Sequence, residues 1–358
     1  MSQSCRIAVH LTEINFRGST VATLAYSRGL QAFGIDLLFV APLFQGHQES
    51  AVNQVKGLGE LYYYEDWESL ELILDRRGVD AIYVLKSGAK DHLVSKAVPT
   101  WVHAVFPTPI TGFHGDKFAF ISEWLANFSS CGVMPYIPHA VRSPLPVLGL
   151  REELRIPKSS LVLGYYGGEN SFDIRFAKVA LKEALDARKD LYTIFLNVRP
   201  FVAHERALFL AGTSDLTRKD QFVTACDAMI HARSIGETFG VACAEFSAAN
   251  KPVITYAHSH QKAHLHMLKD KALTYSGYTG LKDILLNLDR VRLAEVDWNA
   301  FKSGYDEATV TEVFLRVFRS PVIRRPGIQT KICVSTRSLL WRIERQWRKT
   351  GFIGFEGL

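Results

Sequence analysis

The sequence predicts an α/β protein in which two doubly wound domains follow one another along the chain. Its 358 residues suffice for two domains of roughly 100–200 residues each. Short strand-like segments alternate with helical segments, and the pattern restarts after a proline-bearing stretch at 137–160. Alternation of this kind builds parallel βαβ units whose strands are covered on both faces. We therefore expect two parallel sheets.

The first series of segments begins close to the start of the chain. Its strand-like runs are rich in β-branched and aromatic residues, and they lie at 6–11, 36–41, 80–85 and 100–106. Two segments between them have helical periodicity and end in glycine, 19–34 and 66–78. Further apolar runs at 118–124 and 133–141 continue the series up to the proline-bearing stretch.

The second series has the same character. Its strand-like runs lie at 161–168, 191–198, 207–212, 228–233 and 251–256. Helical segments are expected at 172–188, at 218–227 and around Glu245. We therefore place one domain at 1–145 and a second at 146–320. A basic helical tail at 321–358 is expected to pack back on the first domain.

Composition and charge narrow the function classes. Lys and Arg total 42 against 36 for Asp and Glu, a net charge of +6 that fits phosphate-bearing ligands but indicates no nucleic acid as partner. The five cysteines lie far apart without a CxxC pair, so we expect reduced thiols. No run approaches the ~18 apolar residues of a membrane span. We expect a cytoplasmic protein, with peripheral contact at the inner membrane face as an open alternative.

One apolar stretch carries two carboxylates, "SIGETFGVACAEFSAANKPVITY" at 234–256. An expected strand leads into a turn, and a helix is expected to begin near Phe239. Glu237 precedes the helix, where free backbone N–H groups gather and an anion such as a diphosphate can bind. Glu245 lies two turns farther on, about 12 Å along the axis. Two carboxylates flanking a diphosphate suit a nucleotide sugar, which has a sugar at one end and a ribose at the other.

This stretch resembles the E-x7-E signature of retaining GT-B glycosyltransferases, most closely glycosyltransferase family 4. The residues that carry the resemblance are Glu237, Thr238, Phe239, Gly240, Glu245 and Lys251–Ile254. The resemblance implies a GT-B fold, two Rossmann-like domains facing a cleft. It also implies a metal-independent, retaining transferase of the hexosyltransferase type, which moves a sugar from a nucleoside diphosphate sugar to a hydroxyl acceptor without a cofactor.

The resemblance also implies residue roles. Glu237 and His103, which lies in the strand-like run "TWVHAVF", would be the catalytic residues beside the donor sugar; for His103 a hydrogen-bonded core residue is the alternative. Glu245 would bind the ribose hydroxyls. Backbone amides of the helix start would bind the diphosphate, with Thr238, Phe239, Gly240 and Val241 as the donor-binding residues. Gly18 would also lie near the phosphates, and so would Gly167 and Gly168 unless they form only a tight turn.

One departure from the family pattern concerns the diphosphate. The family places an Arg and a Lys after the first strand of its second domain, and here Tyr165 and Phe172 stand near those positions. The charge could come instead from Arg175, Lys178, Arg199 or Arg17. A catalytically impaired nucleotide-sugar-binding protein therefore remains an alternative, and so does a GT-B sugar epimerase.

The acceptor side is less defined. We expect it in the first domain, with Arg17, His114 and Asp116 as candidates and a glycan, a lipid-linked sugar or a protein as acceptor. Four histidines at 258–266 are interpreted as a polar loop, and no metal site is expected. The tail would place apolar residues on one helical face and basic residues elsewhere: Leu339, Leu340, Ile343 and Trp347, against Arg342, Arg345, Arg348 and Lys349.

Overall fold

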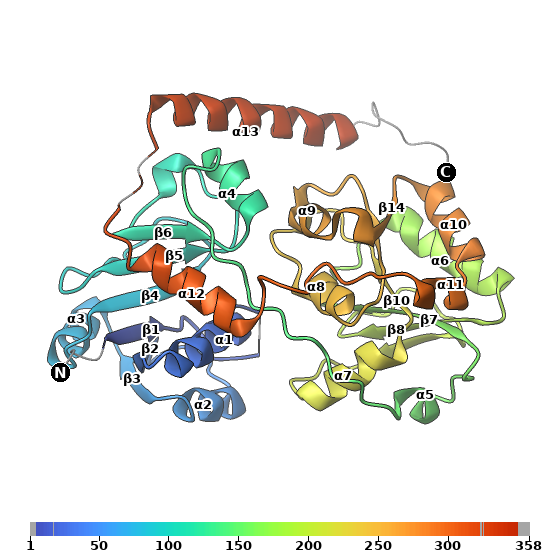
Figure 1. The fold of residues 1–358 in the computed structure, drawn as a ribbon, viewed down its shortest axis with the longest axis horizontal. Coiled ribbons are helices and arrows are strands. Elements are labelled where there is room, and N and C mark those ends of the chain that lie inside the picture. Colours follow the sequence, from blue (N-terminus) through green and yellow to red (C-terminus); the bar gives the residue numbers. More distant parts are fainter. Residues whose placement is uncertain (1–4, 17, 323, 325, 350–358) are drawn as a thin grey trace. The chain divides into compact units, whose positions relative to one another are not determined.

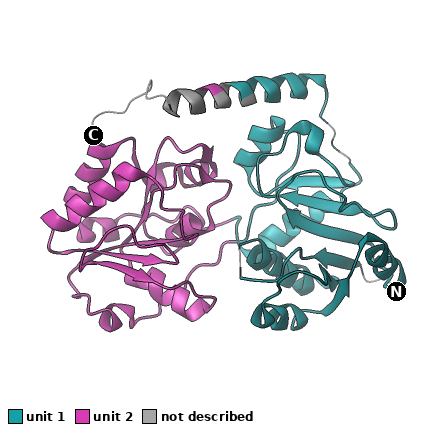
Figure 2. Ribbon diagram, turned by 180° about the vertical axis from the view of Figure 1, so that it is seen from behind, with its two compact units in different colours: residues 1–140, 304–339 teal, residues 141–303, 340–358 magenta. Residues whose placement is uncertain are grey.

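The chain forms two compact units, which Figure 2 shows in separate colours. The computed structural model describes residues 5–16, 18–322, 324 and 326–349; beyond Arg337 it describes the side chains of Leu339 and Ile343. Unit 1 comprises residues 1–140 and 304–339, and unit 2 comprises 141–303 and 340–358. Each unit contains a six-stranded sheet with parallel pairing throughout, so the predicted α/β class is confirmed.

The sheet of unit 1 is doubly wound, with its topological switch point between β1 and β4 (Figure 1). Ligands of open parallel sheets bind at the carboxyl ends of the strands next to such a point. The strand order is β3-β2-β1-β4-β5-β6: β1 (Arg6–His10), β2 (Asp36–Pro42), β3 (Glu60–Tyr64), β4 (Ala81–Lys86), β5 (Thr100–Ala104) and β6 (Lys117–Phe120).

Helices cover both faces of this sheet. Successive side chains of its buried strands point to opposite faces, so both faces are apolar. Ile82 and Val84 pack in one cluster with Leu70 and Leu74 of α3, whereas the ring of Tyr83 meets that of Phe314 on α12, with centroids 4.9 Å apart. The helices of unit 1 are α1 (Gly18–Ala32), α2 (Glu49–Lys56), α3 (Trp67–Arg76), η1 (Ile110–Gly112), α4 (Glu123–Ser130), α12 (Glu307–Phe318) and the part of α13 (Ile328–Lys349) up to residue 339.

Helix α12 belongs to unit 1, although our sequence-based boundary places it in the second domain. It packs close to α1 because Gly29 has no side chain: a Cβ there would lie 2.1 Å from Thr311 Oγ1. Phe318 stacks on Trp101 with centroids 5.3 Å apart. The local sequence of 304–318 carries no sign of which sheet this helix covers, since its partners lie more than 200 residues earlier.

The sheet of unit 2 repeats this architecture, and its order is β14-β12-β10-β7-β8-β9. Its strands are β7 (Leu161–Tyr166), β8 (Leu191–Leu196), β9 (Ala207–Leu210), β10 (Ala228–His231), β12 (Val253–Tyr256) and β14 (Ala272–Tyr275). A two-stranded sheet joins β11 (Gly236–Glu237) to β13 (Gln261–Lys262).

Seven α-helices and one 3-10 helix lie wholly within the described residues of unit 2. They are α5 (Leu150–Glu153), α6 (Arg175–Ala187), α7 (Leu216–Ala225), α8 (Val241–Ala248), α9 (Ala263–Leu268), η2 (Lys269–Lys271), α10 (Tyr278–Asn287) and α11 (Arg290–Glu295). Gly164 lets α8 approach β7 closely, because a Cβ there would lie 3.0 Å from Phe246 Cζ of α8, as well as 2.3 Å from Cys226 Sγ at the end of α7. This close packing fixes the helix that carries Glu245.

The cysteine prediction is wrong for one pair. Cys131, at the end of α4, forms a disulfide with Cys333 of α13. The two residues are 202 positions apart, so their spacing carries no signal of the pairing. Cys5, Cys226 and Cys243 are free thiols.

The tail is helical over Ile328–Lys349, and its residues up to 339 group with unit 1. Leu339 and Ile343 are 58% and 40% exposed, while the other residues of the two expected faces lie outside the described side chains. No helix within the described ranges is long and apolar enough to cross a membrane.

Candidate functional site

The residues that precede α8 place Glu237 at the carboxyl end of the unit 2 sheet. After β10 the chain turns through Gly236, whose φ of +73° and close approach to Gln261 O exclude a side chain. Gly240 has φ +93°, and a Cβ there would lie 3.2 Å from Glu237 Cβ. Helix α8 begins at Val241, two residues later than expected from the sequence. The glycines therefore let Glu237 fold against the start of the helix.

Glu237 forms an ion pair at this point. Its Oε1 lies 2.8 Å from Arg233 Nη1 and 3.3 Å from His231 Nε2. Burial alone would raise the pKa of Glu237, but the hydrogen bond and charge of His231 and the charge of Arg233 lower it to about 2. The carboxylate is 20% exposed and the Arg233 side chain 34%. Glu237 is therefore ionised at neutral pH and shares its accessible edge with a cation.

A buried polar layer supports this pair. His231 Nδ1 lies 2.8 Å from Thr255 Oγ1, and His264 Nε2 lies 3.1 Å from the same oxygen. Burial lowers the pKa of His264 to about 3, so its ring is neutral. His264 Nδ1 is buried and has no hydrogen-bond partner among the described residues. Of the four histidines at 258–266, the fold thus buries His264 beneath Glu237.

Glu245 lies in a second ionic cluster of unit 2. Lys219 Nζ, from α7, is 2.7 Å from Glu245 Oε2 and 2.9 Å from Oε1. The Tyr166 hydroxyl donates to Oε2, and Lys219 also lies over the Tyr166 ring, 4.7 Å from its centroid. Beside them Arg142 forms a two-point ion pair with Asp220. The Glu245 side chain is only 7% exposed. Any ligand hydroxyl that reaches Glu245 must therefore share it with Lys219.

Three of the cations expected near the phosphates belong to unit 2. Arg175 begins α6, Lys178 Nζ lies 5.1 Å from the ring centroid of Phe201, and Arg199 pairs with Glu169 at 3.5 Å. The structure brings two further cations, Arg233 and Lys219, to the two glutamates. Sequence reasoning missed both, although Arg233 stands four residues before Glu237. Tyr165 and Phe172, which stand near the positions of the family's Arg and Lys, are each 2% exposed and carry no charge.

The loop after β7 is tied to the turn that precedes Glu237. Asp173 accepts hydrogen bonds from Ser234 N at 2.7 Å and from Ser234 Oγ at 2.9 Å. A Cβ at Gly167 would lie 2.6 Å from Ser171 Oγ, so packing requires glycine there. A Cβ at Gly168 would meet nothing within 4 Å. Only Gly168 of the two therefore borders open space.

The remaining residues of the helix start differ in accessibility. Thr238 and Phe239 are buried, with 8% and 2% exposure, whereas Val241 is 38% exposed. In unit 1, Gly18 opens α1, and its surroundings are open within 4 Å of a built Cβ. Arg17 lies outside the described residues.

His103 is enclosed in the core of unit 1. Its exposure is 0%, Nδ1 lies 3.0 Å from the Tyr83 hydroxyl and Nε2 lies 3.0 Å from Ile137 O. Burial above all lowers its pKa to about 3. A contact of this imidazole with a donor sugar would therefore require the ring to leave both partners.

Buried neutral histidines lead to a prediction about pH. The pKa is lowered to about 4 in His10 and His139 and to about 3 in His103 and His264, mainly by burial. The unfolded chain binds these protons near pH 6.5, so it holds more protons than the folded chain between pH 6.5 and 4. The free energy of unfolding should fall as the pH drops through this window, by up to ~1.4 kcal/mol per pH unit for each ring.

Denaturant titrations at several pH values between 7.5 and 5 test this expectation. His139 Nδ1 lies 3.0 Å from the Tyr26 hydroxyl, and a His139→Asn variant retains a polar group there. In this variant the unfolding free energy should depend less steeply on pH, by the contribution of about one proton. An unfolding free energy that stays constant from pH 7 to 5 would contradict it.

Unit 1 has its own polar cluster at the carboxyl ends of its strands. His10 Nε2, at the end of β1, lies 2.8 Å from the Tyr64 hydroxyl at the end of β3. Lys86, at the end of β4, pairs with Asp91 and lies 3.0 Å from His114 Nε2. His10 Nδ1 is buried and has no hydrogen-bond partner in the described part of the chain. This cluster adjoins the switch point between β1 and β4, where a ligand is expected.

Sequence reasoning found only part of that cluster. His114 is in it, but Asp116 is not, since Asp116 Oδ2 accepts a hydrogen bond from Thr100 N at the start of β5 (2.7 Å). His10 was missed, although a histidine that ends the apolar run "RIAVH" is a recognisable signal. Among the described residues no group of three or more His, Cys, Asp or Glu side chains is arranged to hold a metal ion.

Comparison with known proteins gives one relative in sequence and many in structure. No family model matches the chain. Lipid-A-disaccharide synthase of Methylobacillus flagellatus is 29% identical over 218 residues, which are 54% of this chain and 56% of that protein. The chain thus matches only about half the length of this curated relative.

Three solved structures share the fold. Anabaena Alr3699/HepE in complex with UDP and glucose has a TM-score of 0.64 at 12% identity, covering 88% of this chain and 99% of its own. A Rickettsia africae glycosyltransferase has 0.61 at 11% identity, covering 96% and 99%. TarM has 0.65 at 8% identity, covering 88% and 99%. The expected GT-B fold is confirmed.

Proposed function

We propose that the protein is a glycosyltransferase that moves a sugar from a nucleoside diphosphate sugar to a hydroxyl acceptor. The observation that carries the proposal is the Glu237–Arg233 ion pair at the start of α8, at the carboxyl end of a parallel sheet in a GT-B fold. Ligands of such sheets bind at this edge. The binding of UDP and glucose by Alr3699/HepE supports the same choice of donor class.

The donor is proposed to lie along the start of α8. Glu237 accepts hydrogen bonds from the sugar hydroxyls, and Glu245 faces the ribose. Arg233 and Lys219 neutralise the diphosphate. They take over the role of the family's Arg and Lys, near whose positions this chain has Tyr165 and Phe172. Stabilising the leaving diphosphate with fixed cations and helix-start amides supplies the main catalytic term, so the reaction needs no metal. We propose a retaining reaction of the family 4 type on the strength of the E-x7-E spacing alone.

The acceptor is proposed to bind at the carboxyl edge of the unit 1 sheet. His10, Lys86 and Asp91 there form a cluster that can hold a polyhydroxyl group, because imidazole, ammonium and carboxylate supply both donors and acceptors. The side chain of Asp91 is 41% exposed, so it forms the accessible edge of the cluster. Glycan, lipid-linked sugar and protein acceptors all present such a hydroxyl.

A second candidate function is a protein that binds a nucleotide sugar without transferring the sugar. The burial of Tyr165 and Phe172 favours it, since two uncharged rings that pack 5.3 Å apart stand near the positions where the family places its cations. The two candidates share the donor site and differ in turnover.

A thermal-shift screen against UDP-, GDP-, ADP- and dTDP-sugars tests the shared donor site. One donor at about 100 times its Kd should stabilise the protein by ~2.7 kcal/mol and raise Tm by a few degrees. Glu245→Ala should abolish this rise relative to its own ligand-free Tm. Glu183→Ala, which removes an ion pair with Lys282 elsewhere in unit 2, should leave the rise unchanged.

Product analysis then separates the two candidates. Release of the nucleoside diphosphate and an NMR spectrum showing the same anomeric configuration in donor and product would establish a retaining transferase. Binding without release would favour the second candidate. No shift with any donor would contradict both.

A further inference from the structure

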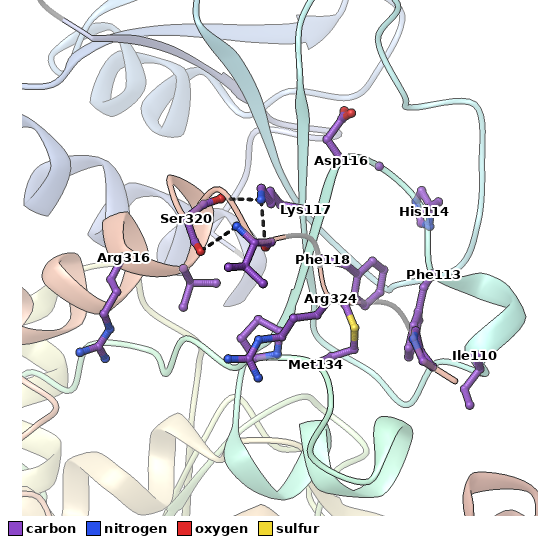
Figure 3. Close-up of a pocket in the computed structure, with 15 residues that line it drawn as sticks. Ile110, Phe113, His114, Asp116, Lys117, Phe118, Met134, Arg316, Ser320 and Arg324 are labelled. Carbon is purple, nitrogen blue, oxygen red and sulfur yellow. Dashed lines mark hydrogen bonds between the residues drawn. The ribbon is translucent and has the colours of Figure 1, made fainter. Parts of the chain in front are cut away.

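We propose that a pocket in unit 1, outside the donor site, binds a phosphate-bearing amphiphile. The pocket has a volume of about 540 Å³, within the range of small-molecule sites. Its walls come from the segment before β6, from β6 itself, from the residues after α4, and from the end of α12 with the chain that follows it (Figure 3). The proposal stands whether or not the protein transfers sugars.

Cations dominate the polar part of the pocket. Arg316 and Arg324 are exposed, and neither has a carboxylate within ion-pair distance among the described residues; Arg324 Nη1 only approaches Val133 O at 3.5 Å. Lys117 Nζ donates to Ser320 O at 2.5 Å and to Val322 O at 3.1 Å, which fixes the wall that carries Arg324. Asp116 is the single carboxylate in the lining. The pocket therefore has a surplus of positive charge.

His114 does not offset or add to this charge. Burial lowers the pKa of its imidazole, so the ring is neutral at physiological pH, and its Nδ1 lies 2.7 Å from Gly112 O. Asp116 is also occupied, because its Oδ2 accepts the hydrogen bond from Thr100 N. An anion is thus the ligand that Arg316 and Arg324, which form no ion pair with a described residue, favour, because one guanidinium can donate two parallel hydrogen bonds to phosphate oxygens.

The other end of the pocket is apolar. Phe113 and Phe118 pack with ring centroids 4.8 Å apart, and Met134 and Ile110 complete this part of the lining. In Figure 3 Arg316 lies at one end, Ile110 and Phe113 lie at the other, and Arg324 lies between them. A phosphate held by the arginines would therefore direct an attached alkyl chain over the aromatic residues.

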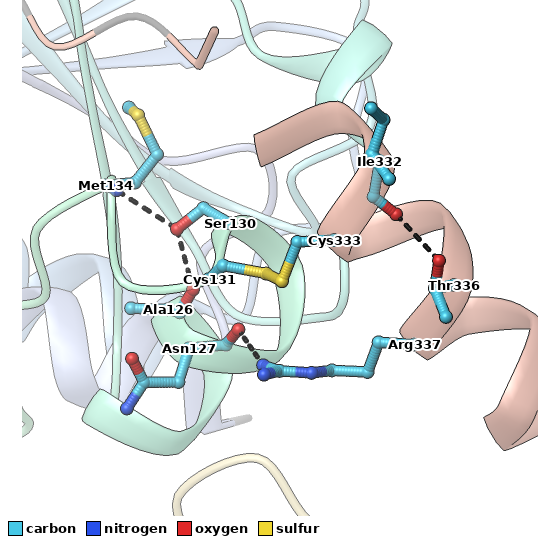
Figure 4. The surroundings of a disulfide bond; sticks show 9 residues. All are labelled: Ala126, Asn127, Ser130, Cys131, Met134, Ile332, Cys333, Thr336 and Arg337. Carbon is cyan, nitrogen blue, oxygen red and sulfur yellow. Dashed lines mark hydrogen bonds between the residues drawn. A yellow bond between two sulfur atoms is a disulfide. The ribbon is translucent and has the colours of Figure 1, made fainter. Parts of the chain in front are cut away.

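The disulfide next to the pocket keeps this arrangement in place. Cys131 and Cys333 tie α4 to α13, and Arg337 of α13 also hydrogen-bonds to the carbonyl oxygen of Asn127 (Figure 4). Met134 N donates to Ser130 Oγ at 3.0 Å, which ties the pocket residue Met134 to the same end of α4. Both ends of the segment that carries Arg324 are thus anchored, by Lys117 on one side and by the disulfide on the other.

Charge and shape together select the ligand class. Inorganic phosphate would leave the apolar lining in contact with water, and an uncharged amphiphile would leave the two arginines without an anion. Each Å² of apolar ligand surface that is buried stabilises the complex by about 25 cal/mol, in addition to the interaction of the charges. A phosphate ester with an alkyl chain is the chemistry that meets both halves, and lipids and lipid-linked phosphates share it.

Titration calorimetry with dodecyl phosphate below its micelle-forming concentration tests the proposal without any nucleotide sugar. Saturable binding is expected, at least tenfold tighter than binding of inorganic phosphate or of dodecyl maltoside. Arg316→Ala and Arg324→Ala should each weaken it about tenfold. Arg319→Ala, the matched control, removes an exposed arginine from the C-cap of α12 outside the pocket lining and should change nothing.

Three results would overturn the proposal. The first is no binding of dodecyl phosphate to the unaltered protein. The second is equal binding of dodecyl maltoside or of inorganic phosphate, which would show a detergent surface or a simple anion site. The third is unchanged affinity in both arginine variants. Because both arginines are exposed, their variants should retain the Tm of the parent, which the same samples can verify.

Discussion

A Glu237→Gln variant is expected to lose about 10²–10³-fold in kcat/KM for sugar transfer. Glutamine has the size of glutamate but no charge, so it cannot balance Arg233 at 2.8 Å or receive the hydrogen bond of His231 as an anion. Loss of one charged hydrogen-bond group at a developing charge costs about 2.7–4 kcal/mol of transition-state stabilisation. Steady-state assays of nucleoside diphosphate release measure the effect.

A matched control separates this site effect from a general effect of charge removal. Glu153→Gln removes a carboxylate of unit 2 that pairs with Arg218 at 2.6 Å on the surface, and its activity should stay within about twofold of the parent. If Glu237→Gln also keeps its activity within threefold, the proposed role of Glu237 is wrong. A fall in kcat with unchanged KM would indicate that Glu237 stabilises the transition state and not the bound substrate.

A Lys219→Met variant is expected to lower the free energy of unfolding by about 3–5 kcal/mol. Lys219 is the cation nearest Glu245, whose side chain is 7% exposed, and Met keeps the length of the side chain without its charge. The change leaves a nearly buried carboxylate with the Tyr166 hydroxyl as its remaining direct partner. Denaturant unfolding without any ligand gives the measurement.

The double variant Lys219→Met/Glu245→Leu tests the physical reason for that loss. Replacing both partners removes the uncompensated charge, so part of the lost stability should return, less the ~1–3 kcal/mol for the unpaired Tyr166 hydroxyl. A single Lys219→Met variant within 1 kcal/mol of the parent would instead mean that Glu245 is not held by this ion pair. The result bears on the donor site, because a carboxylate held by Lys219 is already oriented before a ribose arrives.

Much of the fold was predictable from short-range pattern. The alternation of strand-like and helical segments led to two parallel α/β units, and the structure confirms this class. The residues from 228 to 248 correctly predicted a strand, a turn and a helix, with the helix start displaced from Phe239 to Val241. Glycines at 236 and 240 with positive φ account for this shift, since they extend the turn by two residues.

The partners of the candidate site residues were not predictable in this way. Lys219 lies 26 residues before Glu245 on another helix, and Asp173 reaches Ser234 across 61 residues. His103 illustrates the reverse case, because its position in an apolar strand is visible in the sequence while its two hydrogen-bond partners at Tyr83 and Ile137 are not.

By itself the sequence determined the class of the two sheets, the placement of the two glutamates on either side of a helix start, and the absence of charge at Tyr165 and Phe172. Tertiary structure alone decided that Arg233 and Lys219 pair with these glutamates, that α12 covers the unit 1 sheet, and that Cys131 meets Cys333. The reason is physical. Periodicity reports which face of a helix or strand is buried, whereas ion pairs, disulfides and pockets depend on which distant segments pack together.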